Sequence, residues 1–135
     1  MKHEFMRYFG AAMLVAGLSA APALAAGNLA TEIHTAAVHA GLSAKSSTLK
    51  MVHAHMHHAL NCLAGPTGKD FDSAALDPCK NEGNGAISDA TSAAMKQRLE
   101  DVALLLQKGL SDRNLHGAQA IAAKAEQELN GMGKK

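Results

Sequence analysis

The residues best suited to chemistry are histidines gathered in one short segment of this 135-residue chain. Four histidines and two methionines fall within residues 51–58, and six histidines lie within residues 34–58. Imidazole nitrogens bind copper, zinc and nickel. Core packing explains such a density poorly, because every buried imidazole nitrogen needs a polar partner. The segment therefore predicts a transition-metal site, with copper or zinc as the expected ion and nickel as a further possibility.

One row of side chains on this segment is the first choice for the site. At 100° per residue, His53 and His57 lie one turn apart on the side of the apolar stripe, where a neighbouring helix can add a ligand. His39, on the preceding helix, is the expected third ligand. Met56 lies in the same stripe and is a possible soft ligand, although a core-filling role explains it more simply.

A second row points about 180° away from the first and is the alternative. It contains His55, His58 and Cys62, and its expected third ligand is His34. This row faces solvent unless the following loop folds over it. One metal ion cannot collect all four histidines of an intact helix, so the two rows exclude each other. His116, far along the chain, is expected to be a solvated residue.

The sequence offers no catalytic constellation. It contains no HExxH, no GxSxG, no phosphate-binding glycine loop after a strand and no isolated pair of carboxylates. The Glu-x-x-His pairs that a di-iron bundle needs are also absent. We therefore expect a binding protein and not an enzyme.

The elements that must position the histidines are helices. Apolar residues recur at intervals of three and four, and no alternating strand pattern occurs. Hydroxyl residues before the second helix and Ser88 with Asp89 before the third offer N-caps. Short connections favour an all-α fold, an antiparallel four-helix bundle. The expected helices cover residues 28–43, 49–64, 90–109 and 112–129.

A long loop over residues 65–85 separates the second and third helices. It is rich in Gly, Pro, Asp and Asn, with one possible short helical turn at residues 73–76. Cys62 and Cys79 are the only cysteines, and an even count in an exported chain favours a disulfide across this loop.

The N-terminal sequence predicts export. Lys2 and Arg7 precede an apolar run over residues 8–18, and a small-residue segment ends at Ala25. We expect residues 1–25 to be a cleaved signal peptide and residues 26–135 to form a single domain in the periplasm or outside the cell. After cleavage, no remaining stretch is long and apolar enough to anchor the protein in a membrane.

The composition of residues 26–135 excludes several partner classes. Eleven basic and eleven acidic side chains balance, so no charged surface for nucleic acid is expected. Phe71 is the only aromatic residue of this part, which excludes a stacking platform for bases.

Three functions remain. The first is a periplasmic protein that binds copper or zinc for buffering, sensing or resistance. The second is a b-type haem electron carrier that uses two of the histidines, or one histidine with Met56, as axial ligands. The third is a metal-free interaction or chaperone-like module whose histidines respond to pH. A homodimer is a possible assembly in each case.

Overall fold

The computed structural model describes residues 27–134, which form helices joined by turns and one long loop. No β-strand occurs among these residues, so the all-α class is confirmed. The leader expected over residues 1–25 lies outside the described residues. The described helices are α1 (Leu29–Lys45), α2 (Leu49–Ala64), α3 (Ala86–Asp89), α4 (Ala93–Ser111) and α5 (Leu115–Met132).

Each long helix begins directly after a polar residue that caps it. The side chain of this residue accepts a hydrogen bond from the backbone N–H three residues further on. Such a cap satisfies one of the free N–H groups of the first turn. Thr48 caps α2, as the hydroxyl residues before this helix predict. The other caps are Asn28, Ser92 and Asn114.

The helix α4 begins later than predicted. Ser88 and Asp89 do not cap it, because they belong to the separate one-turn helix α3, which Ala90 ends with a ψ of 128°. The Asp89 carboxylate instead accepts hydrogen bonds from the backbone and side-chain N–H groups of Asn84, at 2.8 and 3.1 Å. Ser92 caps α4 instead.

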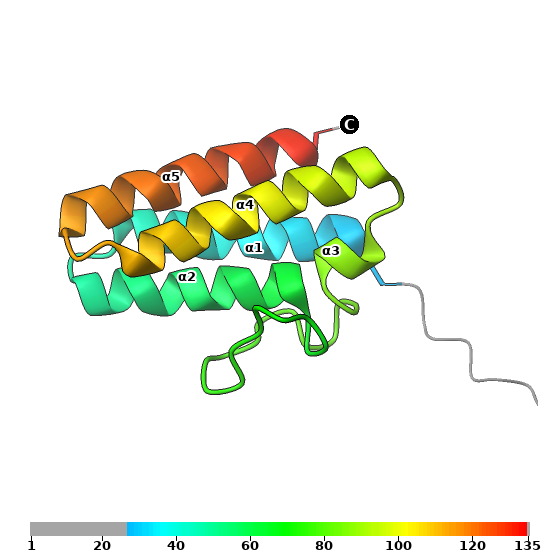
Figure 1. The fold of residues 1–135 in the computed structure, drawn as a ribbon, viewed down its shortest axis with the longest axis horizontal. Helices are drawn as coiled ribbons and strands as arrows, with labels where there is room; N and C mark the ends of the chain where they lie inside the picture. Colours follow the sequence, from blue (N-terminus) through cyan, green and yellow to red (C-terminus); the bar gives the residue numbers. More distant parts are fainter. Residues whose placement is uncertain (1–26, 135) are drawn as a thin grey trace, which may run out of the picture.

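The long helices lie alongside one another around a core rich in alanine (Figure 1). The helix α1 packs against both α2 and α5, and α4 packs against α5 and α2. Small alanine side chains at such contacts allow helices to approach closely. None of the helices in residues 27–134 has the length and apolar character needed to cross a membrane. The largest fully buried apolar side chains are Met56, Leu63, Leu99, Leu106 and Leu129.

A disulfide ties the loop between α2 and α3 to the end of α2. Cys62 and Cys79 are bonded, with their Cα atoms 5.1 Å apart, and both are buried, which confirms the prediction. The buried Asn61 side chain donates to two loop carbonyls, at 3.0 and 3.1 Å, and accepts from the Asp72 N–H at 2.8 Å. Residues 73–76 form no helix but a single turn, in which the Ala75 N–H donates to the Asp72 carbonyl oxygen at 3.2 Å.

Candidate metal centre

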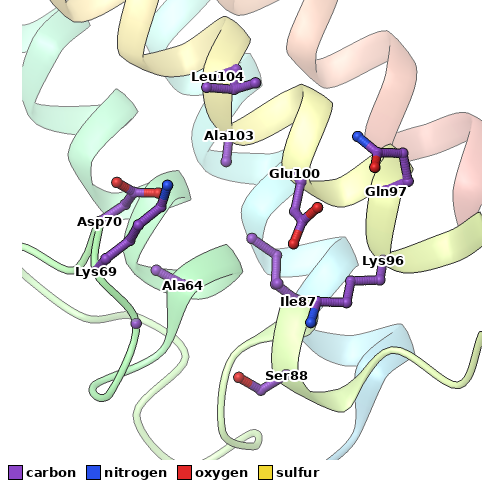
Figure 2. Close-up of a pocket in the computed structure, with 11 residues that line it drawn as sticks. Ala64, Lys69, Asp70, Ile87, Ser88, Lys96, Gln97, Glu100, Ala103 and Leu104 are labelled. Atoms are coloured by element: carbon purple, nitrogen blue, oxygen red, sulfur yellow. The ribbon is translucent and has the colours of Figure 1, made fainter. Parts of the chain in front are cut away.

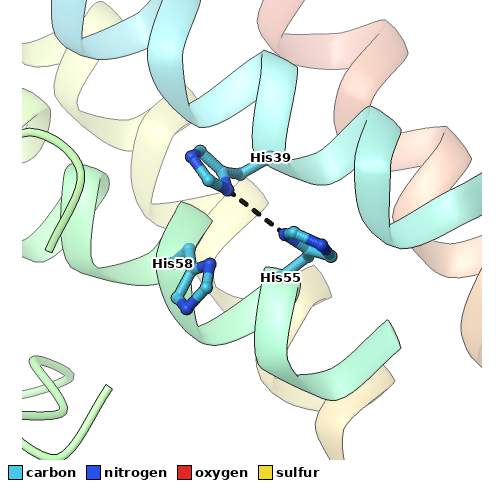
Figure 3. A group of neighbouring side chains, drawn as sticks. All are labelled: His39, His55 and His58. Atoms are coloured by element: carbon cyan, nitrogen blue, oxygen red, sulfur yellow. Dashed lines mark hydrogen bonds between the residues drawn. The ribbon is translucent and has the colours of Figure 1, made fainter. Parts of the chain in front are cut away.

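Three histidines from two helices gather into one compact group (Figure 3). His39 comes from α1, whereas His55 and His58 come from α2. One ring nitrogen from each residue lies within 4.8 Å of the other two. The ring centroids are 5.1 to 5.6 Å apart, and the three nitrogens are close enough together to bind one metal ion. We call His39, His55 and His58 the histidine group.

The hairpin of α1 and α2 positions these rings. Only residues 46–48 separate the two helices, so α2 folds back along α1. His55 and His58 are three residues apart and share one side of α2. Cys62 continues their row, and the sulfur of its disulfide partner lies 3.9 Å from the carbonyl oxygen of Glu32 on α1. This side of α2 therefore lies toward α1, with His55 and His58 half-buried.

Burial keeps two of the three imidazoles neutral. The pKa of His39 falls from 6.5 to about 4, mainly because burial disfavours the charged ring and further because His58 and His55 repel a second charge. The pKa of His58 is lowered by burial first and then by His55 and His57. Metal ions bind neutral imidazole. At neutral pH, His39 and His58 are therefore in the form that binds a metal.

The ring nitrogens have few partners within the protein. Nδ1 of His39 and Nδ1 of His55 lie 3.3 Å apart, so one must carry the proton that the other accepts. Nδ1 of His58 is buried and has no hydrogen-bond partner. Two nitrogens that bind one tetrahedral zinc ion at ~2.0–2.1 Å are about 3.3 Å apart. The spacing of His39 and His55 matches this value, and a metal ion would also satisfy the His58 nitrogen.

The first-choice residues on α2 lie beside other partners. Nε2 of His53 is 3.0 Å from the Asp112 carbonyl oxygen, at the turn between α4 and α5. Nδ1 of His57 is 3.2 Å from the Asp72 carboxylate in the long loop. The structure therefore brings neither residue into a group with His39. These two histidines link α2 to neighbouring segments of the chain.

The remaining candidates also lie apart from the histidine group. His34 is exposed on α1. Met56 is fully buried, with its thioether against Gly109, so its sulfur faces α4. His116 is exposed on α5, with Nδ1 3.2 Å from the Gln119 side-chain oxygen.

Sequence reasoning singled out all three members of the histidine group but divided them between two rows. The helical wheel separates His53 and His57 from His55 and His58, yet it does not show which row meets α1. One residue, Cys62, indicates which of the two rows is covered by other parts of the protein. Cys62 shares the row of His55 and His58, and a disulfide in a small domain is normally buried, so this row had to be covered by protein.

A groove of about 390 Å³ lies between α3, α4 and the long loop (Figure 2). Its lining presents charges of both signs, with Lys69 and Asp70 from the loop and Lys96 and Glu100 from α4. It contains no histidine and no cysteine, and so offers a late transition metal no imidazole or thiolate ligand. The histidine group is the stronger candidate site.

No protein-family model, curated protein or solved structure matches this chain. Its function is therefore inferred from the residues and their geometry.

Proposed function

We propose that this is an exported protein that binds one late transition metal ion, copper or zinc, through His39, His55 and His58. The observation that carries the proposal is the convergence of three imidazole nitrogens within 4.8 Å. Buffering, sensing or resistance are the roles that suit a metal site without a catalytic motif. We further propose an antiparallel four-helix bundle as the arrangement of the long helices, with α1 and α2 supplying the ligands.

The ligand chemistry favours Cu(II) and Zn(II). Imidazole suits both ions, and the general order of affinities places Cu(II) above both Zn(II) and Ni(II). A thiolate would favour Cu(I), but both cysteines of the sequence are joined in the disulfide. Three protein ligands also leave a fourth position open for water or a small ligand. An open position suits a protein that takes up an ion and later releases it.

Export is supported by the disulfide together with the leader-like N-terminal sequence. Disulfides form and persist in oxidising compartments such as the periplasm. The described residues include the Cys62–Cys79 bond and no free cysteine. We therefore propose the periplasm or the extracellular space as the location of a mature domain over residues 26–135.

A competition titration with Cu(II) or Zn(II) tests the proposed ligands. We expect one equivalent to bind to the wild type. His39→Ala and His58→Ala should each weaken binding by at least about tenfold, the loss typical even of outer-shell partners. His34→Ala is the matched control, because this histidine is exposed on the same helix as His39. If His53→Ala with His57→Ala loses the ion while His39→Ala keeps it, the proposed ligand set is wrong.

The haem carrier and the metal-free module stay predictions that the same protein sample can test. A haem iron takes at most two protein ligands on its axis, so haem leaves the third clustered imidazole unexplained. A Soret band in the purified protein would favour haem. The absence of both a Soret band and stoichiometric metal would favour the interaction module.

A further inference from the structure

Two carboxyl groups lie against each other where the first turns of α1 meet α3 and the end of the long loop (Figure 1). Glu32 of α1 is fully buried, and its side chain forms a hydrogen bond with that of Asp89 in α3. A Cβ added to Gly83 would meet both side chains, so the two carboxyl groups also contact the same glycine. We call Glu32 and Asp89 the carboxyl pair.

Two consecutive backbone N–H groups hold the carboxyl pair in place. The Asn84 N–H donates to Oδ2 of Asp89 at 2.8 Å, and the Gly85 N–H donates to Oε1 of Glu32 at 2.7 Å. The side-chain amide of Asn84 donates to Oδ1 of Asp89 at 3.1 Å. Both oxygens of Asp89 thus accept from N–H donors, whereas Oε2 of Glu32 is buried without a donor among the described residues. An oxygen that carries a proton needs an acceptor and not a donor, so Asp89 is the carboxylate of the pair and Glu32 is the acid.

The contact between the two carboxyl groups requires a proton. Ionised carboxylates only accept hydrogen bonds, so two of them cannot bond to each other unless one is protonated. The pKa of Glu32 rises from 4.5 to about 7, mainly because burial disfavours its charged form. The Gly85 N–H opposes this rise, and the nearby Asp89 and Glu82 add to it. No lysine, arginine or histidine of residues 27–134, from α2, α4, α5 or elsewhere, lies within 4.0 Å of these three carboxyl groups.

We propose that Glu32 and Asp89 bind one proton between them, and that this proton controls how firmly α3 and the loop end are held on α1. The inference goes beyond metal binding and does not depend on it. When Glu32 releases the proton to solvent, two adjacent carboxylates remain, with Glu82 as a third negative charge nearby. Their repulsion and the cost of a buried charge both oppose the closed arrangement. Acid should therefore tighten this junction, and alkali should loosen it.

The loosening should be local, because other contacts hold the loop on α1 without this proton. The Asn28 N–H donates to the Glu82 carbonyl oxygen at 2.7 Å, and the Thr35 hydroxyl donates to Oε1 of Glu82 at 2.9 Å. The disulfide fixes an earlier part of the loop to α2. We therefore expect residues 84–89 to open in a partial unfolding step while the long helices stay in place.

An NMR titration of the metal-free protein, labelled with ¹³C in its glutamate carboxyl groups, measures the proton directly. We expect the Glu32 signal to titrate near pH 7. Glu32→Gln identifies this signal by removing it. Asp89→Asn should lower the Glu32 midpoint by at least about one pH unit, a tenfold loss of proton affinity. Glu128→Gln is the matched control, because it alters an exposed glutamate on α5 and should leave the midpoint unchanged.

Amide hydrogen exchange tests the structural consequence. The N–H groups of Asn84 and Gly85 both donate to the carboxyl pair. Their protection factors, corrected for the intrinsic pH dependence of exchange, should fall about tenfold between roughly pH 6 and pH 8. Glu32→Gln should abolish this fall, because a neutral amide can still accept from Gly85 and donate to Asp89. The amides of Val52 and Leu60, within α2, should show no such fall in either protein.

Two results would overturn the inference. A Glu32 midpoint near the ordinary 4.5 would show that the pair holds no proton at neutral pH. Constant protection at Asn84 and Gly85 while Glu32 titrates near pH 7 would show that the proton does not control the junction. Zinc titration separates these outcomes from the metal proposal, because Glu32→Gln should bind zinc as the wild type does. A wild type that titrates as expected but binds no zinc rejects only the metal site.

Discussion

His58 shows, for a single residue, why the histidine group suits a metal ion better than protons. Its Nδ1 is buried without a partner, and its pKa is lowered by burial and by the adjacent His55 and His57. Protonation would place a positive charge on one ring and leave the lone pairs of the other rings unused. A metal ion accepts lone pairs from all three rings at once. The surroundings that oppose protonation therefore favour coordination.

Acid is expected to destabilise the metal-free protein through His39. The pKa of its imidazole is about 4 in the folded protein, against 6.5 ordinarily, so between these values the unfolded chain binds more protons. The free energy of unfolding should therefore fall as the pH falls through this window. Urea denaturation at about pH 7, 5.5 and 4.5 measures this dependence. His39→Ala should reduce the dependence, and His34→Ala should retain it. Equal slopes in the wild type and His39→Ala would show that His39 titrates normally.

At the scale of the elements, local sequence predicts the helices but not how they face one another. The apolar stripe of α2 is buried as predicted, with Val52, Met56 and Leu60 in the core. The helix that covers the row of His55 and His58 could not be predicted from the sequence. It depends on where α1 packs, and only this packing brings His39 beside His55. The later start of α4 has a local cause. The Asp89 carboxylate accepts a hydrogen bond from Asn84 in the loop and therefore does not cap α4.

Removal of the disulfide tests how far the loop depends on its covalent link. Cys62→Ala with Cys79→Ala should lower the free energy of unfolding by about 3 kcal/mol, the chain-entropy value for a loop of roughly 15–20 residues. Urea denaturation without reductant measures this loss, and reductant should produce a similar loss in the wild type. An unaffected midpoint in the double variant would mean that the Asn61 hydrogen bonds alone hold the loop.

Across the whole molecule, the interior is built from small side chains. Alanine is the commonest buried apolar residue of the described chain, and each alanine removes little area from water, which limits the hydrophobic stabilisation at ~25 cal/mol per Å². Links between helices then matter more for stability. The disulfide joins α2 to the loop, and His53 joins α2 to the turn before α5. A metal ion held by the histidine group would join α1 to α2.

Metal binding is therefore expected to stabilise the entire fold. An ion that binds only the folded state adds RT ln(1 + [L]/Kd), about 2.7 kcal/mol at a hundredfold excess over Kd. Thermal melts of metal-free and zinc-loaded protein at neutral pH should show a higher midpoint for the loaded form. The gain should disappear in His39→Ala, which removes the only ligand from α1, and remain in His34→Ala.

The pH at which this stabilisation fades provides the sharper part of the test. Protons displace a metal from imidazole as the ring becomes charged. Because the pKa values of His39 and His58 are both lowered, that of His39 to about 4, protons compete weakly with zinc at these two rings. The zinc-dependent rise in midpoint should therefore fade at a pH below the ordinary histidine pKa of ~6.5. If the zinc-dependent increase in the melting midpoint is already lost near the ordinary histidine pKa, the zinc ligands are solvent-exposed histidines. A midpoint that ignores zinc throughout, in a protein that circular dichroism shows to be helical, would favour the metal-free interaction module.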